Sequence, residues 1–257
     1  MARRFTYYAN LAPSYDADAQ AFFTAASITD SGQKTAINTL VLGLKSASIW
    51  SKIPCIYPFV GGNATAHSYN LKNPATFQLT FFGGWTHSAT GATPNGTNAY
   101  ATTNFKPQTN YALVTSRGYG FYTNTNNITA TYSMGVYQSA NNAYYGMNHS
   151  GSFALTGDIS ASASYTATNS VGHSLTQKFS NTDNKSYRNG VQVGSSVVTN
   201  NRDTNFQYYL GAMNGDNTAQ IFAPHNLQTA HIHDDLNVTD IGNLYTLLLN
   251  YNTTLSR

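Results

Sequence analysis

The chain has 257 residues, only 9% of them charged, and a formal net charge of +3 at pH 7. Typical domains carry about 25% charged residues, so Ser, Thr, Asn, Gly and Tyr fill an unusually large share here. No basic run is present that would follow a phosphate backbone, and we therefore expect no nucleic-acid partner.

Residues 1–15 are expected to form an extended arm, because they are aromatic, irregular and contain a proline. Arginines can pair with a partner's carboxylates, and aromatic rings can fill its pockets. The alternative is an arm laid along its own sheet. The candidate partner-binding residues are Arg3, Arg4, Phe5, Tyr7 and Tyr8.

Residues 16–52 predict a helical segment with two helices. Asp16 and Asp18 stand in the first turn of the first helix, where the helix dipole favours acids. Thr29 or Asp30 can cap the second helix, with Gln33 three residues after Asp30. Its apolar residues fall on one face, namely Ile37, Leu40, Val41, Leu44 and Ala47.

Residues 53–235 have a different pattern, in which short strand-like runs alternate with turns rich in Gly, Asn, Ser and Pro. Their spacing of roughly 8 to 15 residues is typical of an antiparallel sandwich or barrel. Asn189-Gly190 predicts a two-residue hairpin turn. The single cysteine, Cys55, permits no intrachain disulfide, and its apolar neighbours predict a buried, inert thiol.

Residues 236–257 predict a final helix, with Thr239 as N-cap and Asp240 in the first turn. Its apolar stripe comprises Ile241, Leu244, Tyr245, Leu248 and Tyr251. We expect the terminal helices to pack together on one side of the sandwich, so that residues 15–257 form one compact domain. No apolar run reaches membrane-spanning length, and we expect no membrane contact.

Several stretches carry a resemblance to a known family. "PNGTNAYATT" and "SYRNGVQVG" resemble an early strand and a hairpin of laminin-G-like, concanavalin A-like jelly rolls. With the helical prefix, the block "GGWTHSATGATPNGTNAY" and the final helix, nearly the whole chain resembles LamG-like proteins encoded by tailed bacteriophages. The resemblance implies an all-β antiparallel jelly-roll sandwich with two N-terminal helices and one C-terminal helix.

For function, the resemblance implies a structural protein of the virion, displayed on the head or tail as a decoration, fibre or adhesion-like component. Its partners would be other virion proteins and copies of itself. The alternative is a carbohydrate-binding, lectin-like adhesin that recognises host surface glycans. Low charge suits both readings, because Thr, Asn, Ser and Tyr hydrogen-bond without the desolvation cost of ions.

An enzyme is not expected. The concanavalin A-like superfamily contains glucanases that use a Glu-x-Asp-x-x-Glu strand, and this sequence has no glutamate. Among its ten aspartates, Asp234 and Asp235 are adjacent, so in a strand they point to opposite faces. No Gly-x-Ser-x-Gly elbow is present either. We therefore predict no catalytic residue and no cofactor.

A metal site is also not expected. His231 and His233 would lie on one face of a strand, and two such imidazoles can ligate a metal. The reading that we favour is a polar strand end before a helix cap. A calcium site built from scattered Asp and Asn oxygens stays open.

Two clusters of Tyr, Asn and Gly are candidate contacts for a glycan or a protein partner, since Tyr is enriched at interfaces. The alternative is that they alternate between core and edge, and in Tyr144-Tyr145 one ring must face inward and one outward. The candidate residues are Tyr119, Tyr122, Asn141, Asn142, Tyr144 and Tyr145.

Overall fold

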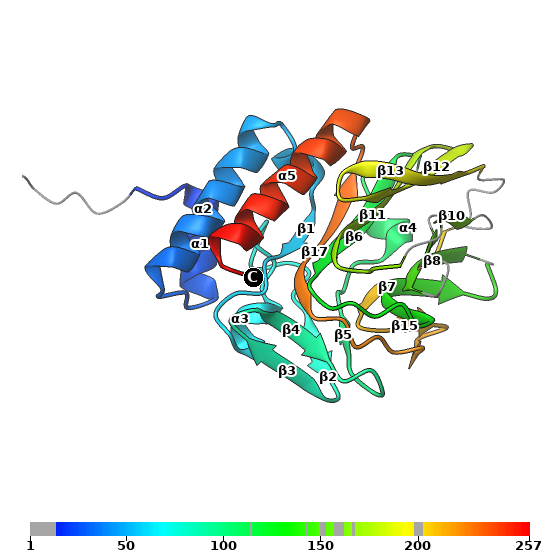
Figure 1. The fold of residues 1–257 in the computed structure, drawn as a ribbon, viewed down its shortest axis with the longest axis horizontal. Coiled ribbons are helices and arrows are strands. Elements are labelled where there is room, and N and C mark those ends of the chain that lie inside the picture. Colours follow the sequence, from blue (N-terminus) through cyan, green and yellow to red (C-terminus); the bar gives the residue numbers. More distant parts are fainter. Residues whose placement is uncertain are drawn as a thin grey trace, which may run out of the picture.

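Two β-sheets pack face to face, and three helices cover the outer face of one of them (Figure 1). This computed structural model describes residues 14–113, 115–141, 143–149, 153–156, 162–165, 168–197 and 203–257. Six predicted contact residues lie outside the described residues: Arg3, Arg4, Phe5, Tyr7, Tyr8 and Asn142. The predictions for the arm and for Asn142 therefore stay predictions.

The helix-covered sheet has, in spatial order, β13 (Val191–Ser196), β12 (Asp183–Arg188), β11 (Gly172–Ser180), β6 (Arg117–Thr123), β17 (Leu227–Asp234), β4 (Gly91–Pro94) and β3 (Trp85–Ser88). Strand β1 (Cys55–Tyr57) also pairs with β17. All of these ladders are antiparallel. The predicted turn between β12 and β13 is confirmed, because Asn189 and Gly190 have φ angles of 48° and 76°.

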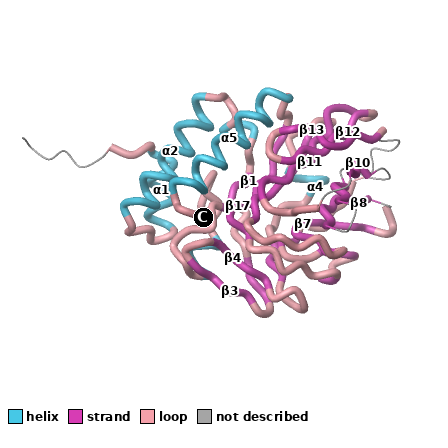
Figure 2. Tube along the Cα trace, viewed as in Figure 1, coloured by secondary structure: helices cyan, strands magenta, loops and turns pink. Residues whose placement is uncertain are grey.

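The second sheet is here called the tyrosine-rich sheet. Its order is β10 (Ser162–Tyr165), β9 (Phe153–Thr156), β8 (Ala143–His149), β7 (Thr131–Gln138), β14 (Tyr209–Leu210), β5 (Tyr100–Thr102) and β2 (Thr80–Phe82). A short hairpin of β15 (Met213–Gly215) and β16 (Thr218–Gln220) joins it through β7, and β15 runs parallel to β7. Figure 2 shows the strands gathered on one side of the molecule and the long helices on the other.

The helices are α1 (Ala17–Ala25), α2 (Ser31–Ser46), α3 (Ala64–Ser68), α4 (Pro107–Asn110) and α5 (Val238–Thr254), with a 3₁₀ turn at Trp50–Lys52. Of the two predicted caps of α2, Thr29 and Asp30, the structure uses Asp30, whose side chain accepts a hydrogen bond from the Gln33 amide at 2.7 Å. The predicted cap of α5 is wrong. Asn237, not Thr239, is the N-cap, because its side chain and that of Asp240 exchange hydrogen bonds with each other's backbone amides.

Two hydrophobic cores follow from the alternation of side chains along the strands. Phe121 and Ile232 point between the sheets, whereas Leu175 points toward the helices. In the core between the helices and their sheet, Leu40 of α2 and Leu244 of α5 are 1% and 0% exposed. The predicted packing of the terminal helices is therefore confirmed. Cys55 is buried as predicted, and burial raises the pKa of its thiol.

No helix within the described residues combines the length and the apolar character needed to cross a membrane.

Candidate glycan-contact surface

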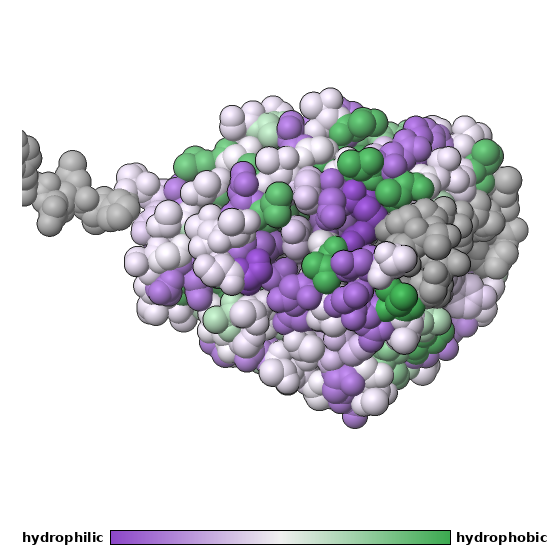
Figure 3. All heavy atoms as spheres, viewed as in Figure 1, coloured by the Kyte–Doolittle hydropathy of each residue, from purple (hydrophilic) through white to green (hydrophobic). Residues whose placement is uncertain are grey.

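The two sheets differ sharply in charge. The strands of the tyrosine-rich sheet contain no Asp, Glu, Lys or Arg. The strands of the helix-covered sheet contain six such residues: Arg117, Lys178, Asp183, Lys185, Arg188 and Asp234. The shortage of charged residues in the sequence is therefore most marked in the strands of the tyrosine-rich sheet. On the face drawn in Figure 3, the described hydrophobic residues occur in small separate groups among polar ones.

Five neighbouring strands of the tyrosine-rich sheet place aromatic side chains on its outer face. Pairing fixes this arrangement, because Phe82 lies opposite Tyr100 and Tyr137 lies opposite Tyr144. Tyr209 lies opposite Gly135, two residues before Tyr137. The alternate residues of the same strands face the core between the sheets. We call the outer set the aromatic row; it comprises Phe82, Tyr100, Tyr209, Tyr137 and Tyr144.

The rings of the aromatic row form two contacting groups, one of Phe82, Tyr100 and Tyr209 and the other of Tyr137 and Tyr144. Phe82 and Tyr100 are stacked with ring centroids 4.9 Å apart, and so are Tyr100 and Tyr209. Tyr137 and Tyr144 meet edge to face at 5.8 Å. Phe82 is 42% exposed, whereas Tyr209 is 6% exposed, and the other three are half-buried. The row thus combines rings held in place by their neighbours with surface open to solvent.

Two hydroxyl groups on half-buried rings of the row, those of Tyr100 and Tyr137, are available to a ligand. Among the described residues, the hydroxyls of Tyr100, Tyr137 and Tyr209 have no hydrogen-bond partner. Tyr144 differs, because its hydroxyl bonds to that of Tyr132. A buried tyrosine usually satisfies its hydroxyl within the protein, so these groups retain donors and acceptors for an outside partner.

The structure corrects three of the predicted contact residues. Tyr119 and Tyr145 are 1% and 2% exposed and face the core between the sheets, and Tyr122 lies beneath the helices at 9%. Their side chains are therefore not available to a glycan or partner at the surface. Tyr144 does face outward while Tyr145 faces inward, as the alternation predicts. Asn141 is exposed, and its amide donates to the Asp203 carbonyl at 3.0 Å.

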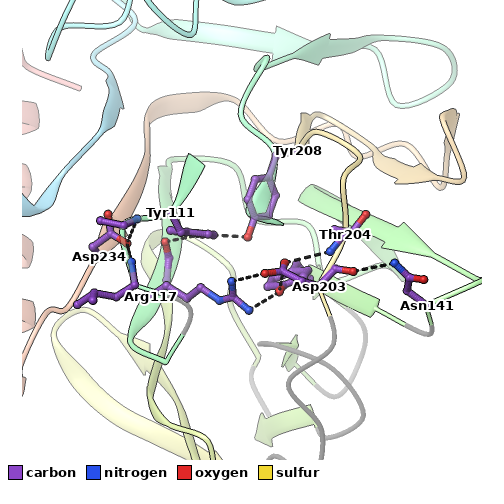
Figure 4. A network of polar contacts seen from close by, with 11 residues as sticks. Tyr111, Arg117, Asn141, Asp203, Thr204, Tyr208 and Asp234 are labelled. Atoms are coloured by element: carbon purple, nitrogen blue, oxygen red, sulfur yellow. Dashed lines mark hydrogen bonds and ion pairs between the residues drawn. The ribbon is translucent and has the colours of Figure 1, made fainter. Parts of the chain in front are cut away.

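Tyr145 belongs to a polar network inside the sandwich, in which Figure 4 labels its partners Arg117 and Asp203. The guanidinium of Arg117 pairs with the Asp203 carboxylate at 2.8 Å and donates to the Tyr145 hydroxyl at 2.7 Å. Tyr145 in turn donates to Asp203 at 2.9 Å. The Arg117 head also lies 5.3 Å from the ring centroids of Tyr111 and Tyr145. The network ties β6, β8 and the segment before β14 together.

The cavity beside this network is too small for a glycan. It is lined by Arg117, Lys178 and Asn184 among others, and its volume of about 10 Å³ leaves room for a single water molecule. Asp234, which Figure 4 also shows, accepts hydrogen bonds from the backbone amides of Ala112 and Leu113. Burial raises the pKa of its carboxyl, partly opposed by these two bonds. We infer a structural role for this network.

The predicted pairing of His231 and His233 on one face is confirmed, but the two imidazoles contact each other. Their Nδ1 atoms are 3.1 Å apart, and Nε2 of His231 lies 2.9 Å from Nε2 of His173. His231 therefore lies between His173 and His233, and each of its two ring nitrogens contacts a nitrogen of another imidazole. Within the described residues, no group of three His, Cys, Asp or Glu side chains has a metal-binding arrangement.

Sequence reasoning missed four members of the aromatic row: Phe82, Tyr100, Tyr137 and Tyr209. Tyr100 and Tyr137 stand apart from other aromatic residues, whereas Phe82 and Tyr209 follow the aromatic residues Phe81 and Tyr208, and neither pair lies in one of the two predicted clusters. The available signal was the absence of charge from every strand-like run that carries them. Only strand pairing over long sequence distances, such as Thr102 with Tyr209, brings them together.

No protein-family model and no curated protein matches the chain. Solved structures do match. One is a mutant of Trypanosoma rangeli sialidase displaying trans-sialidase activity, with a TM-score of 0.55, 11% identity and coverage of 85% of this chain and 40% of that chain. A second is botulinum neurotoxin type C, described as dependent on two ganglioside molecules for cell entry, with a TM-score of 0.55, 13% identity and coverage of 79% and 53%.

A third match is the binding domain of botulinum neurotoxin DC in complex with rat synaptotagmin II, with a TM-score of 0.50, 14% identity and coverage of 78% and 52%. The chain thus aligns with about half, or less, of each of these longer chains. At such identities the likeness shows the fold alone. The predicted all-β antiparallel jelly-roll sandwich with two N-terminal helices and one C-terminal helix is confirmed.

Proposed function

We propose that this protein is a non-catalytic glycan-binding module and that the aromatic row is its contact surface. The observation that carries the proposal is the row itself: five aromatic side chains in two contacting groups, on the outer face of a sheet whose strands carry no charge. The sequence is unusual in its small number of charged residues, and the sheet that would contact the ligand has none in its strands.

The chemistry of the row suits a sugar. The C–H faces of a sugar ring are apolar and pack against aromatic rings, while sugar hydroxyls need partners that donate and accept. Phe82 offers an exposed ring, and Tyr100 and Tyr137 offer hydroxyls with no partner among the described residues. Neutral groups of this kind can be desolvated at smaller cost than ions.

Two further observations support a binding module rather than an enzyme. The sequence has no glutamate, and the Asp203 and Asp234 carboxylates are held by Arg117 and by backbone amides respectively. A structural neighbour is described with gangliosides, which are lipids that carry a glycan headgroup, although its low identity transfers no ligand to this chain.

Truncation of the row should weaken glycan binding at least tenfold. We expect Phe82→Ala and Tyr137→Ala each to do so, because an aromatic anchor at an interface typically contributes more than about 1.4 kcal/mol. The matched control is Val191→Ala, since Val191 is 66% exposed on β13 of the other sheet. Immobilised glycans probed with the three variants measure the effect. Equal binding by all variants would place the contact elsewhere.

The setting that we propose is the virion of a tailed phage, with other virion proteins and copies of itself as neighbours. This part rests on the sequence resemblance of the helical prefix, the block around Trp85 and the final helix, and the structural neighbours add nothing to it. Mass spectrometry of purified particles tests it directly. The chain should be present at a fixed ratio to the major capsid protein, and its absence from the particles would refute this setting.

A further inference from the structure

The aromatic row has a length and a direction that restrict its ligand. Its members lie on β2, β5, β14, β7 and β8, which are neighbours in that order. Since adjacent strands are about 4.8 Å apart, the row spans about 19 Å across the strands. A surface of this length matches several consecutive sugar units rather than one.

The row also continues to the edge of its sheet. Strand β2 is the last in the order, and Phe82 is the most exposed member of the row. The rings lie in two groups along an open sheet face, where a chain can extend past the last ring. A pocket that enclosed the end of a chain would instead surround its ligand on several sides, as small-molecule sites do.

The strands beneath the row offer no charged side chain. A carboxylate or sulfate on a sugar is bound best by Arg or Lys, through charge-assisted hydrogen bonds. The tyrosine-rich sheet has neither residue in any strand, so an anionic sugar placed on the rings would lose hydration without gaining a counter-charge. The chemistry of the surface therefore favours uncharged sugars.

From these three features we infer that the aromatic row binds a neutral, linear polysaccharide, laid across the strands with its internal units on the rings. This inference rests on the proposed glycan-binding function and adds the class of glycan and the orientation of the chain. Because no ion pair contributes, the affinity should change little between low and moderate salt.

The test compares neutral gluco-, manno- and galacto-oligosaccharides, from monosaccharides to chains longer than the row, with oligouronates of equal length. Isothermal titration of the full chain should show affinity that rises at least tenfold with length for one neutral series and then levels off. Phe82→Ala should remove part of this dependence on length, and Tyr137→Ala provides a second interruption of the row. Circular dichroism confirms that each variant is folded.

Three outcomes would overturn the inference. Full affinity for a monosaccharide would mean that the site holds a single unit, and tighter binding of oligouronates would mean that the ligand class is acidic. In both cases the glycan-binding function itself would stand. If none of the neutral or acidic sugars binds, the proposed function fails and the inference fails with it.

Discussion

The protein should lose much of its stability as the pH falls from about 6.5 toward 5. Three buried imidazoles in mutual contact contribute to this loss: His173, His231 and His233 are each 1% exposed or less. Burial lowers the pKa of His231 to about 3. Burial, followed by the neighbouring imidazoles, holds the pKa of His173 and of His233 well below the usual value of 6.5.

The sign follows from the protons bound in each state. Below pH 6.5 the unfolded chain binds a proton at each histidine, whereas the folded protein keeps the imidazoles neutral. The stability due to neutral burial is therefore complete above pH 6.5 and falls as the pH drops toward the folded-state pKa. For His231 the loss at pH 5 is about 2 kcal/mol, and the other two act in the same direction. The total free energy of unfolding of a typical domain is only about 5–15 kcal/mol.

The surroundings of the three imidazoles offer no counter-charge among the described residues. His173 stacks with the rings of Tyr122 and Tyr245, and Arg188 adds a positive charge that lowers its pKa further. On β6, the two glycines Gly118 and Gly120 leave the space that His233 and His231 occupy. A proton added to these three imidazoles would be surrounded by aromatic rings, backbone and the positive charge of Arg188.

Urea unfolding at several pH values between 8 and 5 measures the effect. We expect a steep fall in the free energy of unfolding, and we expect His231→Phe to reduce the slope by about 1.4 kcal/mol per pH unit, because one titrating group is gone. This slope is informative even if the variant is less stable at pH 8. Val191→Ala should keep the wild-type slope. A free energy that stays level from pH 8 to 5 would contradict the prediction.

Local features were predictable from sequence because their causes are local. The Asp30 cap and the Asn189-Gly190 turn each depend on a few neighbouring residues, and both are confirmed. The misplaced cap of α5 shows the limit of this reasoning, because Asn237 and Thr239 both suit a cap and only backbone geometry decides between them.

Features that depend on strand order were not predictable. Strand β6 lies between β11 and β17, which places His173 beside His231 across two glycines of β6. The aromatic row likewise needs β14 to lie between β5 and β7. Periodicity predicted which face of a strand is buried, but it contains no information about which strands become neighbours. Tyr119 and Tyr122 show the consequence, because both faces of β6 are covered, one by the other sheet and one by helices.

Replacement of Arg117 by Met should destabilise the protein by about 3–5 kcal/mol, because it leaves a largely buried carboxylate without its cation. The side chains of Arg117 and Asp203 are 2% and 15% exposed, and their closest atoms are 2.8 Å apart. Lys at this position should rescue little, since it cannot bond to Asp203 and Tyr145 with the fixed fork of a guanidinium. The matched control is Lys185→Met, whose ion pair with Asp183 is much more exposed and should contribute less than about 1 kcal/mol.

A double-mutant cycle distinguishes the ion pair from simple loss of packing. Asp203→Asn combined with Arg117→Met removes both charges, so the double variant should be more stable than the sum of the two single losses predicts. Additive losses, measured by urea unfolding, would show that the pair contributes nothing beyond its separate contacts. The network also bears on the glycan surface, because it holds Tyr145, and Tyr145 is next to Tyr144 on β8. A folded Arg117→Met protein should therefore bind glycan less tightly than the Lys185→Met control, although neither residue belongs to the aromatic row.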